Sequence, residues 1–260
     1  MAFDLSTVTS EAIVRPPRMI LLGVEKIGKS CFAASSDRPF FIPVRGEDGI
    51  DDIPVPKLSS PVQSYDECLG WLGALHGGEH NYGTVVIDST STLEPMVWKK
   101  TCEEHGESCI EKILGGYGKG YTETLKYWRA LADWLDALRR DRHMASILIG
   151  HVTIKRIDDP IVGSYDSFVW DIHHRAASLL YKWADVILFA NSKVVVKSED
   201  AGFGKEIKRG MDVMGGRYLY TQKKPSHPGG GRGVFGRIPY ELPLSWDHFI
   251  QAVQQAGAVS

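Results

Sequence analysis

Residues Gly23 to Ser30 read GVEKIGKS and match the phosphate-loop pattern G-x-x-x-x-G-K-[ST] at every fixed position. The apolar run MILL (19–22) comes just before this stretch, and CFAA (31–34) follows it. The pattern needs a strand, a loop and a helix in this order, because glycines let backbone N–H groups turn toward phosphates and the helix N-terminus adds its positive end. The stretch therefore predicts a nucleoside triphosphate site, and the flanking elements disfavour a chance match in an ordinary turn.

Two side chains of this loop are expected to carry the chemistry. Lys29 should reach the β- and γ-phosphates and serve catalysis, and the Ser30 hydroxyl should be a ligand of Mg²⁺. The predicted cofactors are therefore ATP and Mg²⁺. The residues expected to contact ATP are Gly23, Val24, Glu25, Lys26, Ile27, Gly28, Lys29, Ser30 and Cys31.

A second motif, VVIDS (85–89), places Asp88 at the end of a continuous β-branched run. Such a run is typical of a strand that is covered on both faces. A carboxylate at this point holds the hydration shell of Mg²⁺ in P-loop enzymes, so Ser30 and Asp88 form the predicted metal site. The alternative is a helix N-cap, which Asp and Ser both favour.

Two further polar residues follow predicted strands. Glu47, after FFIPV (40–44), could polarise the attacking water, with Asp48 as a competitor and an ordinary EDG turn as the alternative. His151 ends ASILIGH (145–151) and would lie at the carboxyl edge of the sheet, where it could sense the γ-phosphate. The alternative for His151 is a surface histidine with satisfied hydrogen bonds.

Strands alternating with helices predict a three-layer α/β fold with a mostly parallel central sheet and a C-terminal antiparallel extension. The 260 residues are interpreted as an N-terminal arm (1–17), a possible subunit contact, and a single ATPase domain (18–260). A long helix is predicted from about Thr122 to Asp141 and a last helix near Trp246–Gln255. A formal net charge of −2 means that a polyanion would have to bind a local patch.

The phosphate loop, Glu47, VVIDS and ILIGHV (147–152), taken in this order, resemble the RecA-like recombinase core. They look most like the core-only RecA-type ATPases of bacteriophages that promote single-strand annealing. That family has F-I-D-x-E after the loop, and FFIPVRGE (40–47) gives Glu47 the water-activating role, with residues 43–46 departing from the pattern. GGYGKGY (115–121) looks like the glycine-rich segment of phage members, and the resemblance covers about residues 18–240.

The resemblance implies two DNA-facing loops after the metal-binding strand. The first would be Gly106–Tyr121 and the second Val152–Arg175, both of which mix cations with aromatic residues as single-strand grooves do. An ordinary solvated loop is the alternative, and the four aspartates of the second loop favour it. The residues expected to bind DNA are Lys119, Lys155, Arg156 and Arg175.

The resemblance also implies nucleotide binding between subunits, with cations supplied by a neighbour. Lys223, Lys224 and Arg232 lie in the part of the chain expected for that role, and solvated cations of a surface hairpin are the alternative.

The expected function is therefore an ATP hydrolase, stimulated by DNA, that binds single-stranded DNA and promotes annealing in homologous recombination. Its expected partners are single-stranded DNA, further copies of the chain in a ring or filament, and a single-strand-binding protein. The alternatives are a helicase-like motor, a small-molecule kinase, or a nucleotide-gated binding protein with little turnover. No apolar run is long enough to span a membrane and no C-x-x-C pair is present, so we expect no membrane partner and a cytoplasmic location, in the host if phage-encoded.

Overall fold

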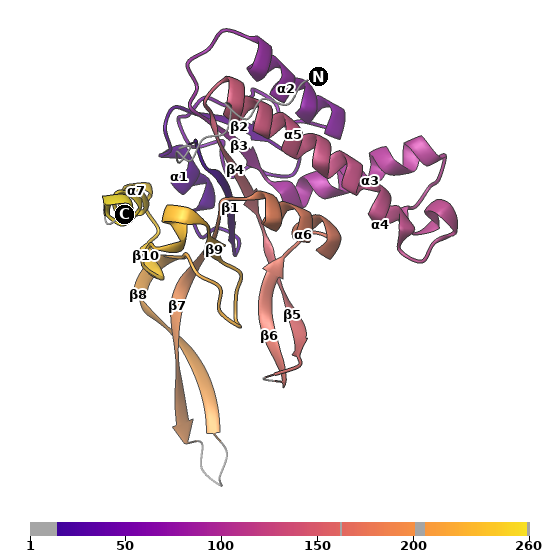
Figure 1. Ribbon diagram of the computed structural model, residues 1–260. Helices are drawn as coiled ribbons and strands as arrows, with labels where there is room; N and C mark the ends of the chain where they lie inside the picture. The colour runs from indigo at the N-terminus through magenta and orange to yellow at the C-terminus, as the bar shows by residue number, and fades with distance from the viewer. Residues whose placement is uncertain (1–14, 162, 201–205, 259–260) are drawn as a thin grey trace, which may run out of the picture.

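A computed structural model describes residues 15–161, 163–200 and 206–258 of the chain, so most of the predicted N-terminal arm (1–14) lies outside it (Figure 1). The main sheet has the strand order β10-β8-β7-β1-β4-β3-β2, with β9 paired to β7. The strands of this sheet are β1 (Arg18–Gly23), β2 (Pro39–Pro43), β3 (Thr84–Asp88), β4 (Ala145–Gly150), β7 (Val186–Asp200), β8 (Glu206–Tyr220), β9 (Gly230–Gly231) and β10 (Glu241–Pro243).

The main sheet changes direction at β7. Strands β2, β3, β4, β1 and β7 are mutually parallel, whereas β8 pairs with β7 and β10 pairs with β8 in antiparallel fashion. The parallel strands therefore bring their carboxyl ends to one edge, where the phosphate loop begins. The predicted parallel sheet with an antiparallel C-terminal extension is confirmed.

Alternate residues of each central strand enter different cores. Ile20 and Leu22 of β1 belong to one apolar cluster, and Met19 and Leu21 belong to the other. Such alternation, with apolar residues on both sides, is expected of a parallel sheet covered on both faces. The fold is thus the three-layer α/β arrangement that the sequence predicts.

Helices form the outer layers. Those with buried residues in the Ile20 cluster are α2 (Tyr65–Gly77), α3 (Thr90–His105), α5 (Leu125–Asp141) and α6 (His174–Trp183). The opposite face is covered by α1 (Lys29–Ala34) and α7 (Trp246–Ala258). The remaining helical segments are α4 (Lys119–Glu123) and the 3-10 helices η2 (Ile110–Gly115) and η3 (Gly233–Gly236).

One predicted helix is divided in the structure, and two further helices, α3 and α6, were not predicted. The predicted helix from Thr122 is two helices, because α4 ends at Glu123 and α5 begins at Leu125. Helix α3 was not predicted, since it contains Pro95 and its buried residues make only a weak stripe. This helix is important for the site, because it starts directly after Asp88 and Ser89.

The second predicted DNA loop is wrong as a loop. Residues Val152–Asp159 (β5) and Gly163–Trp170 (β6) form a two-stranded antiparallel hairpin, and α6 begins at His174. The middle of β5 is exposed on both faces, so the sequence carries little of the alternation that would reveal a strand. Figure 1 shows this hairpin and the longer β7–β8 hairpin both projecting from the helix-covered body. The first predicted loop is also partly helical, because it contains η2 and the start of α4.

Candidate functional site

The phosphate loop connects β1 to α1 through two positions that favour glycine. A Cβ atom on Gly23 would lie 2.5 Å from the carbonyl oxygen of Ala190, so the approach of β1 to β7 requires glycine there. Gly28 has φ +109°, a left-handed conformation that side chains rarely adopt. One fixed glycine of the motif is therefore required by strand packing, and the other by the backbone conformation of the loop itself.

Lys29 is buried at the first position of α1, with 5% of its surface exposed. Its ammonium donates hydrogen bonds to the carbonyl oxygens of Gly23 (2.9 Å) and Val24 (2.8 Å). Burial lowers the pKa of Lys29, although the nearby carboxylates of Asp88 and Glu47 oppose the shift. A bound phosphate would supply a stronger acceptor than these two carbonyl groups.

Ser30 and Asp88 meet as the metal hypothesis requires. The Ser30 hydroxyl donates a 2.6 Å hydrogen bond to Oδ2 of Asp88, which ends β3 and is 4% exposed. Burial raises the pKa of Asp88, and the Glu47 carboxylate adds to the rise. A cation at this point would offset the burial cost, and Mg²⁺ in nucleotide sites typically takes one or two carboxylates plus phosphates. The described residues contain no group of three or more His, Cys, Asp or Glu side chains arranged for a metal, so phosphate oxygens and waters would complete the shell.

Glu47 is held by two hydrogen bonds. Its Oε1 atom accepts from the Ser89 hydroxyl (2.6 Å) and lies 2.8 Å from Nε2 of His151. Burial alone would raise the pKa of Glu47, but the hydrogen bonds from His151 and Ser89 outweigh burial and lower it. The side chain is therefore an ionised carboxylate at neutral pH. Its competitor Asp48 is exposed and does not line the cavity that contains Glu47.

His151 lies directly after β4 and connects the site to the hairpin. Its backbone N–H donates to the Ser91 hydroxyl (3.1 Å), and its carbonyl accepts from the backbone N–H of Asp171 (3.0 Å). Its Nδ1 atom is buried and has no hydrogen-bond partner among the described residues. Because β5 starts at Val152, a shift of His151 would act directly on the root of the hairpin.

One cavity of about 690 Å³ joins these groups. Its walls include the phosphate loop, Glu47, Asp88 and His151, together with Asp171 and Arg217, which sequence reasoning missed. Arg217 comes from β8, and nothing in its local sequence distinguishes it from other strand arginines. Only the pairing of β8 beside β7 brings it to the loop.

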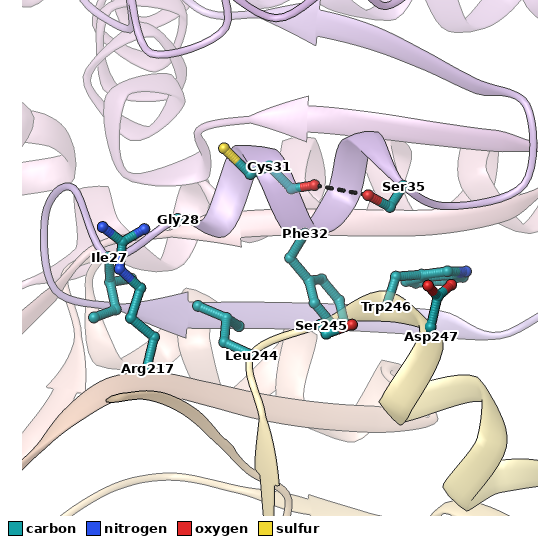
Figure 2. Close-up of a pocket in the computed structure, with 10 residues that line it drawn as sticks. All are labelled: Ile27, Gly28, Cys31, Phe32, Ser35, Arg217, Leu244, Ser245, Trp246 and Asp247. Atoms are coloured by element: carbon teal, nitrogen blue, oxygen red, sulfur yellow. Dashed lines mark hydrogen bonds between the residues drawn. The ribbon is translucent and has the colours of Figure 1, made fainter. Parts of the chain in front are cut away.

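A smaller cavity of about 250 Å³ adjoins the first and shares Gly28, Cys31 and Arg217 with it (Figure 2). Figure 2 shows Arg217 beside Gly28 at one end and Trp246 at the other, with Leu244 between them. The Trp246 ring lies 5.4 Å from the Phe32 ring in an edge-to-face contact. This cavity is thus bounded by the Arg217 guanidinium at one end, by apolar side chains, and by the polar side chains of Ser35, Ser245 and Asp247.

The four residues predicted to bind DNA are separated into two places. Arg175 of α6 donates to the Gly118 carbonyl (3.4 Å) and to the Thr122 hydroxyl, so it lies beside Lys119. Lys155 and Arg156 are on β5, where strand alternation turns them to opposite faces of the hairpin.

The three predicted trans-acting cations are also separated. Lys223 and Lys224 line a different cavity, beside the β5–β6 hairpin. Arg232 lies at the amino end of the sheet, away from the phosphate loop, where its Nε is 3.6 Å from Asp185 and its Nη2 donates to backbone carbonyls including that of Lys182 (2.7 Å). Its guanidinium therefore already has partners within the same chain, and this arrangement gives no support to a role at a neighbour's nucleotide.

Comparison with known proteins gives one family match. The family model described as "AAA domain" matches residues 15–233, a range that includes the phosphate loop, Glu47, Asp88 and His151. Among curated proteins, none matches this chain. Among solved structures, the chain is similar to one described as "Crystal structure of the RadB recombinase", with 10% identity and a TM-score of 0.39 over 79% of this chain and 80% of that chain.

Proposed function

The chain belongs to the AAA domain family, and we propose that it is an ATP hydrolase that binds single-stranded DNA and promotes strand annealing in recombination as a homo-oligomer. The observation that carries the catalytic part is the single cavity that contains Lys29, the Ser30–Asp88 pair and the Glu47–His151 pair. We further propose that one domain, residues 18–260, provides both the nucleotide site and the DNA-binding surface.

Hydrolysis needs a positioned water and charge stabilisation at the γ-phosphate. In our proposal, Glu47 accepts a proton as the water oxygen bonds to the γ-phosphorus and the bond to the β–γ bridging oxygen breaks. Its carboxylate is ionised, and Ser89 and His151 fix its orientation. Lys29 would bind the β- and γ-phosphates, and Mg²⁺ held by Ser30 and Asp88 would supply further positive charge.

The adjoining cavity is proposed to take the nucleoside part of ATP. It begins at Gly28 and Cys31 of the phosphate loop, and the planar Arg217 guanidinium can stack on a base. We expect Arg217→Ala to raise KM for ATP by about tenfold, the loss of roughly one stacking contact. Steady-state kinetics measure this, with Arg129→Ala on the exposed face of α5 as the control, and an unchanged KM in Arg217→Ala would contradict the placement.

DNA binding is proposed to respond to the nucleotide through His151. A γ-phosphate offers a new acceptor to the His151 ring, in competition with Glu47. Both ends of the hairpin are fixed to this residue, since β5 follows it and Asp171 donates to its carbonyl. A change in the ring's partner would therefore shift the hairpin, which carries Lys155 and Arg156.

The test is ATP hydrolysis with and without single-stranded DNA, with annealing and unwinding followed in parallel on the same protein. The proposal expects stimulated hydrolysis, annealing without unwinding, and loss of hydrolysis in Lys29→Ala. Hydrolysis that ignores DNA, with no annealing, would contradict the recombination part and leave a P-loop ATPase. Unwinding would favour the helicase-like alternative, and phosphate transfer to a small molecule would favour a kinase.

A further inference from the structure

A cavity of about 380 Å³ lies outside the nucleotide site, between the β5–β6 hairpin, α6 and the segment 223–228. Its walls are mostly apolar and include aromatic rings from two elements, namely Tyr165 and Phe168 of β6 and Tyr181 of α6. This volume falls in the range of ligand pockets, roughly 300–1,000 Å³. Nothing in the nucleotide chemistry described above uses it.

The hairpin contributes one of its two faces to this cavity. Lys155 and Ile157 of β5 line it, and so do their cross-strand partners Ser167 and Tyr165. The intervening pair, Arg156 and Asp166, points to the other face. Asp158 lies on that other face as well, and none of the aspartates that weakened the sequence argument lines the cavity.

The electrostatic character of the cavity follows from its three lysines. Lys155 comes from the hairpin, and Lys223 and Lys224 come from the facing segment; no Asp or Glu lines the cavity. The facing segment is fixed in place, because the backbone N–H of Phe168 donates to the Ser226 carbonyl (2.9 Å). The His227 ring also stacks on Phe189, with centroids 4.8 Å apart. The three lysines therefore line an apolar cavity, and hydrogen bonds and ring contacts hold the backbone of the facing segment in place.

We propose that this cavity is a base-binding subsite for single-stranded nucleic acid, in which one unpaired base enters the apolar cavity and the lysines bind the flanking phosphates. This inference rests on the proposed function, which requires DNA binding but assigns no base subsite. Sites for single strands combine cations along the backbone with rings on which bases stack. A duplex keeps its base faces covered, so the cavity would select unpaired strands.

The base subsite and the nucleotide cavity are lined by consecutive residues of the chain. Asp171 lines the nucleotide cavity and the next residue, Ile172, lines the base subsite. A change at the γ-phosphate that moves this segment would alter both cavities together.

The experiment compares two labelled oligomers of equal length bound to the full chain, oligothymidylate and an abasic deoxyribose-phosphate strand, at several salt concentrations. The wild-type protein should bind the base-bearing strand about tenfold or more tightly, the scale of one stacked base. Ser178→Trp fills the cavity from an exposed position on α6 and should abolish this preference while binding to the abasic strand persists.

The lysines are tested by the salt dependence. Lys155→Ala should lower the slope of log affinity against log salt by about 0.7, the share of one phosphate contact with a single strand. Lys182→Ala removes an exposed lysine of α6 outside this cavity and should leave the slope unchanged. The double variant Lys223→Ala/Lys224→Ala provides a second test if Ser178→Trp does not fold, with ATP turnover reporting on folding.

Two sets of results would distinguish failure of the base subsite from failure of the proposed DNA-binding function. Equal binding of the two strands by the wild-type protein, or a base preference that survives in folded Ser178→Trp, would overturn the subsite while DNA binding stands. Binding of neither strand above a neutral polymer, in a protein that hydrolyses ATP, would overturn both the subsite and the proposed DNA-binding function.

Discussion

At the carboxyl edge of the sheet, a sequence motif predicts the position of some site residues, whereas only contacts in the structure identify others. Lys29 and Ser30 lie where the phosphate-loop pattern puts them, and Asp88 is within 2.6 Å of the Ser30 hydroxyl. Glu47 was only one of two open choices in the sequence. Its hydrogen bonds to Ser89 and His151 favour it over the exposed Asp48.

The choice between these carboxylates can be tested directly. Glu47→Gln should retain nucleotide binding but lose turnover by about 10²-fold or more, the usual scale for a general base. Asp48→Asn, on the adjacent exposed residue, is the matched control and should turn over normally. Single-turnover hydrolysis with a separate binding measurement checks both, and the reverse pattern would make Asp48 the base.

Glu94 of α3 is a buried carboxyl group with a distinct pH signature. It is 5% exposed and both its oxygens accept from the backbone N–H of His173, at 2.8 and 2.9 Å. Burial raises the pKa of Glu94 to about 7, despite the hydrogen bond from His173. The folded protein therefore keeps a proton that the unfolded chain loses at a lower pH, so this group makes stability fall as pH rises from about 4.5 to 7.

Glu94→Gln should remove that dependence. Relative to wild type, the variant should gain up to about 3 kcal/mol of unfolding free energy between pH 4.5 and pH 8, from about 1.4 kcal/mol per pKa unit. Urea unfolding of both proteins at several pH values measures the difference in unfolding free energy. The pH-dependent contributions of all other titratable groups cancel in this difference, because both proteins share them. A difference that stays constant with pH would show that Glu94 is not protonated in the folded state.

At the level of secondary-structure elements, Asp185, just before β7, forms ion pairs that connect β7 to β1 and to α5 at the amino end of the sheet. Its carboxylate accepts from the guanidinium of Arg18 at the start of β1 (2.9 Å) and lies 2.9 Å from Arg139 of α5. Burial alone would raise the pKa of Asp185, but the hydrogen bonds from Arg18 outweigh burial and lower it. The ion cluster thus connects two strands and a covering helix.

Asp185→Ala removes the carboxylate that Arg18 and Arg139 share, although Arg18 keeps its 3.1 Å pair with Asp136, so it should destabilise the fold by about 3 kcal/mol at neutral pH. Because its pKa is lowered, this contribution is present above the unfolded value of about 3.9 and is lost as pH falls through the folded value. Asp141→Ala removes a carboxylate from surface pairs, which solvent screens, and should leave the unfolding midpoint nearly unchanged. Equal unfolding midpoints for the two variants would contradict this role.

At the scale of the whole molecule, the nucleotide cavity and the lysine-lined base subsite belong to the same three-layer fold. If one domain carries both, as we propose, it offers few phosphate contacts, so tight binding to a long strand would need several copies side by side. The long β7–β8 hairpin and the shorter β5–β6 hairpin project beyond the body (Figure 1). None of the described helices is long and apolar enough to cross a bilayer.

Binding to long single strands should therefore be cooperative, salt-sensitive and stronger with a nonhydrolysable ATP analogue than with ADP. Sedimentation velocity with and without a strand of several tens of nucleotides measures assembly, and a strand too short for two copies is the control. A monomer on both strands in every nucleotide state would contradict assembly on DNA while leaving the ATPase assignment untouched.

The sequence by itself determined the phosphate loop, the buried strands and the order of the α/β elements, because these depend on local backbone requirements and continuous apolar runs. It did not determine α3, whose stripe is weak, or the β5–β6 hairpin, whose middle is exposed on both faces. Only the tertiary structure shows that Arg217 lies at the phosphate loop and that Lys155 and Arg156 lie on opposite faces of their hairpin. It also shows that Lys223 and Lys224 lie beside the β5–β6 hairpin. The physical reason is that these positions follow from strand pairing and sheet order between distant segments, and no local pattern records such pairing.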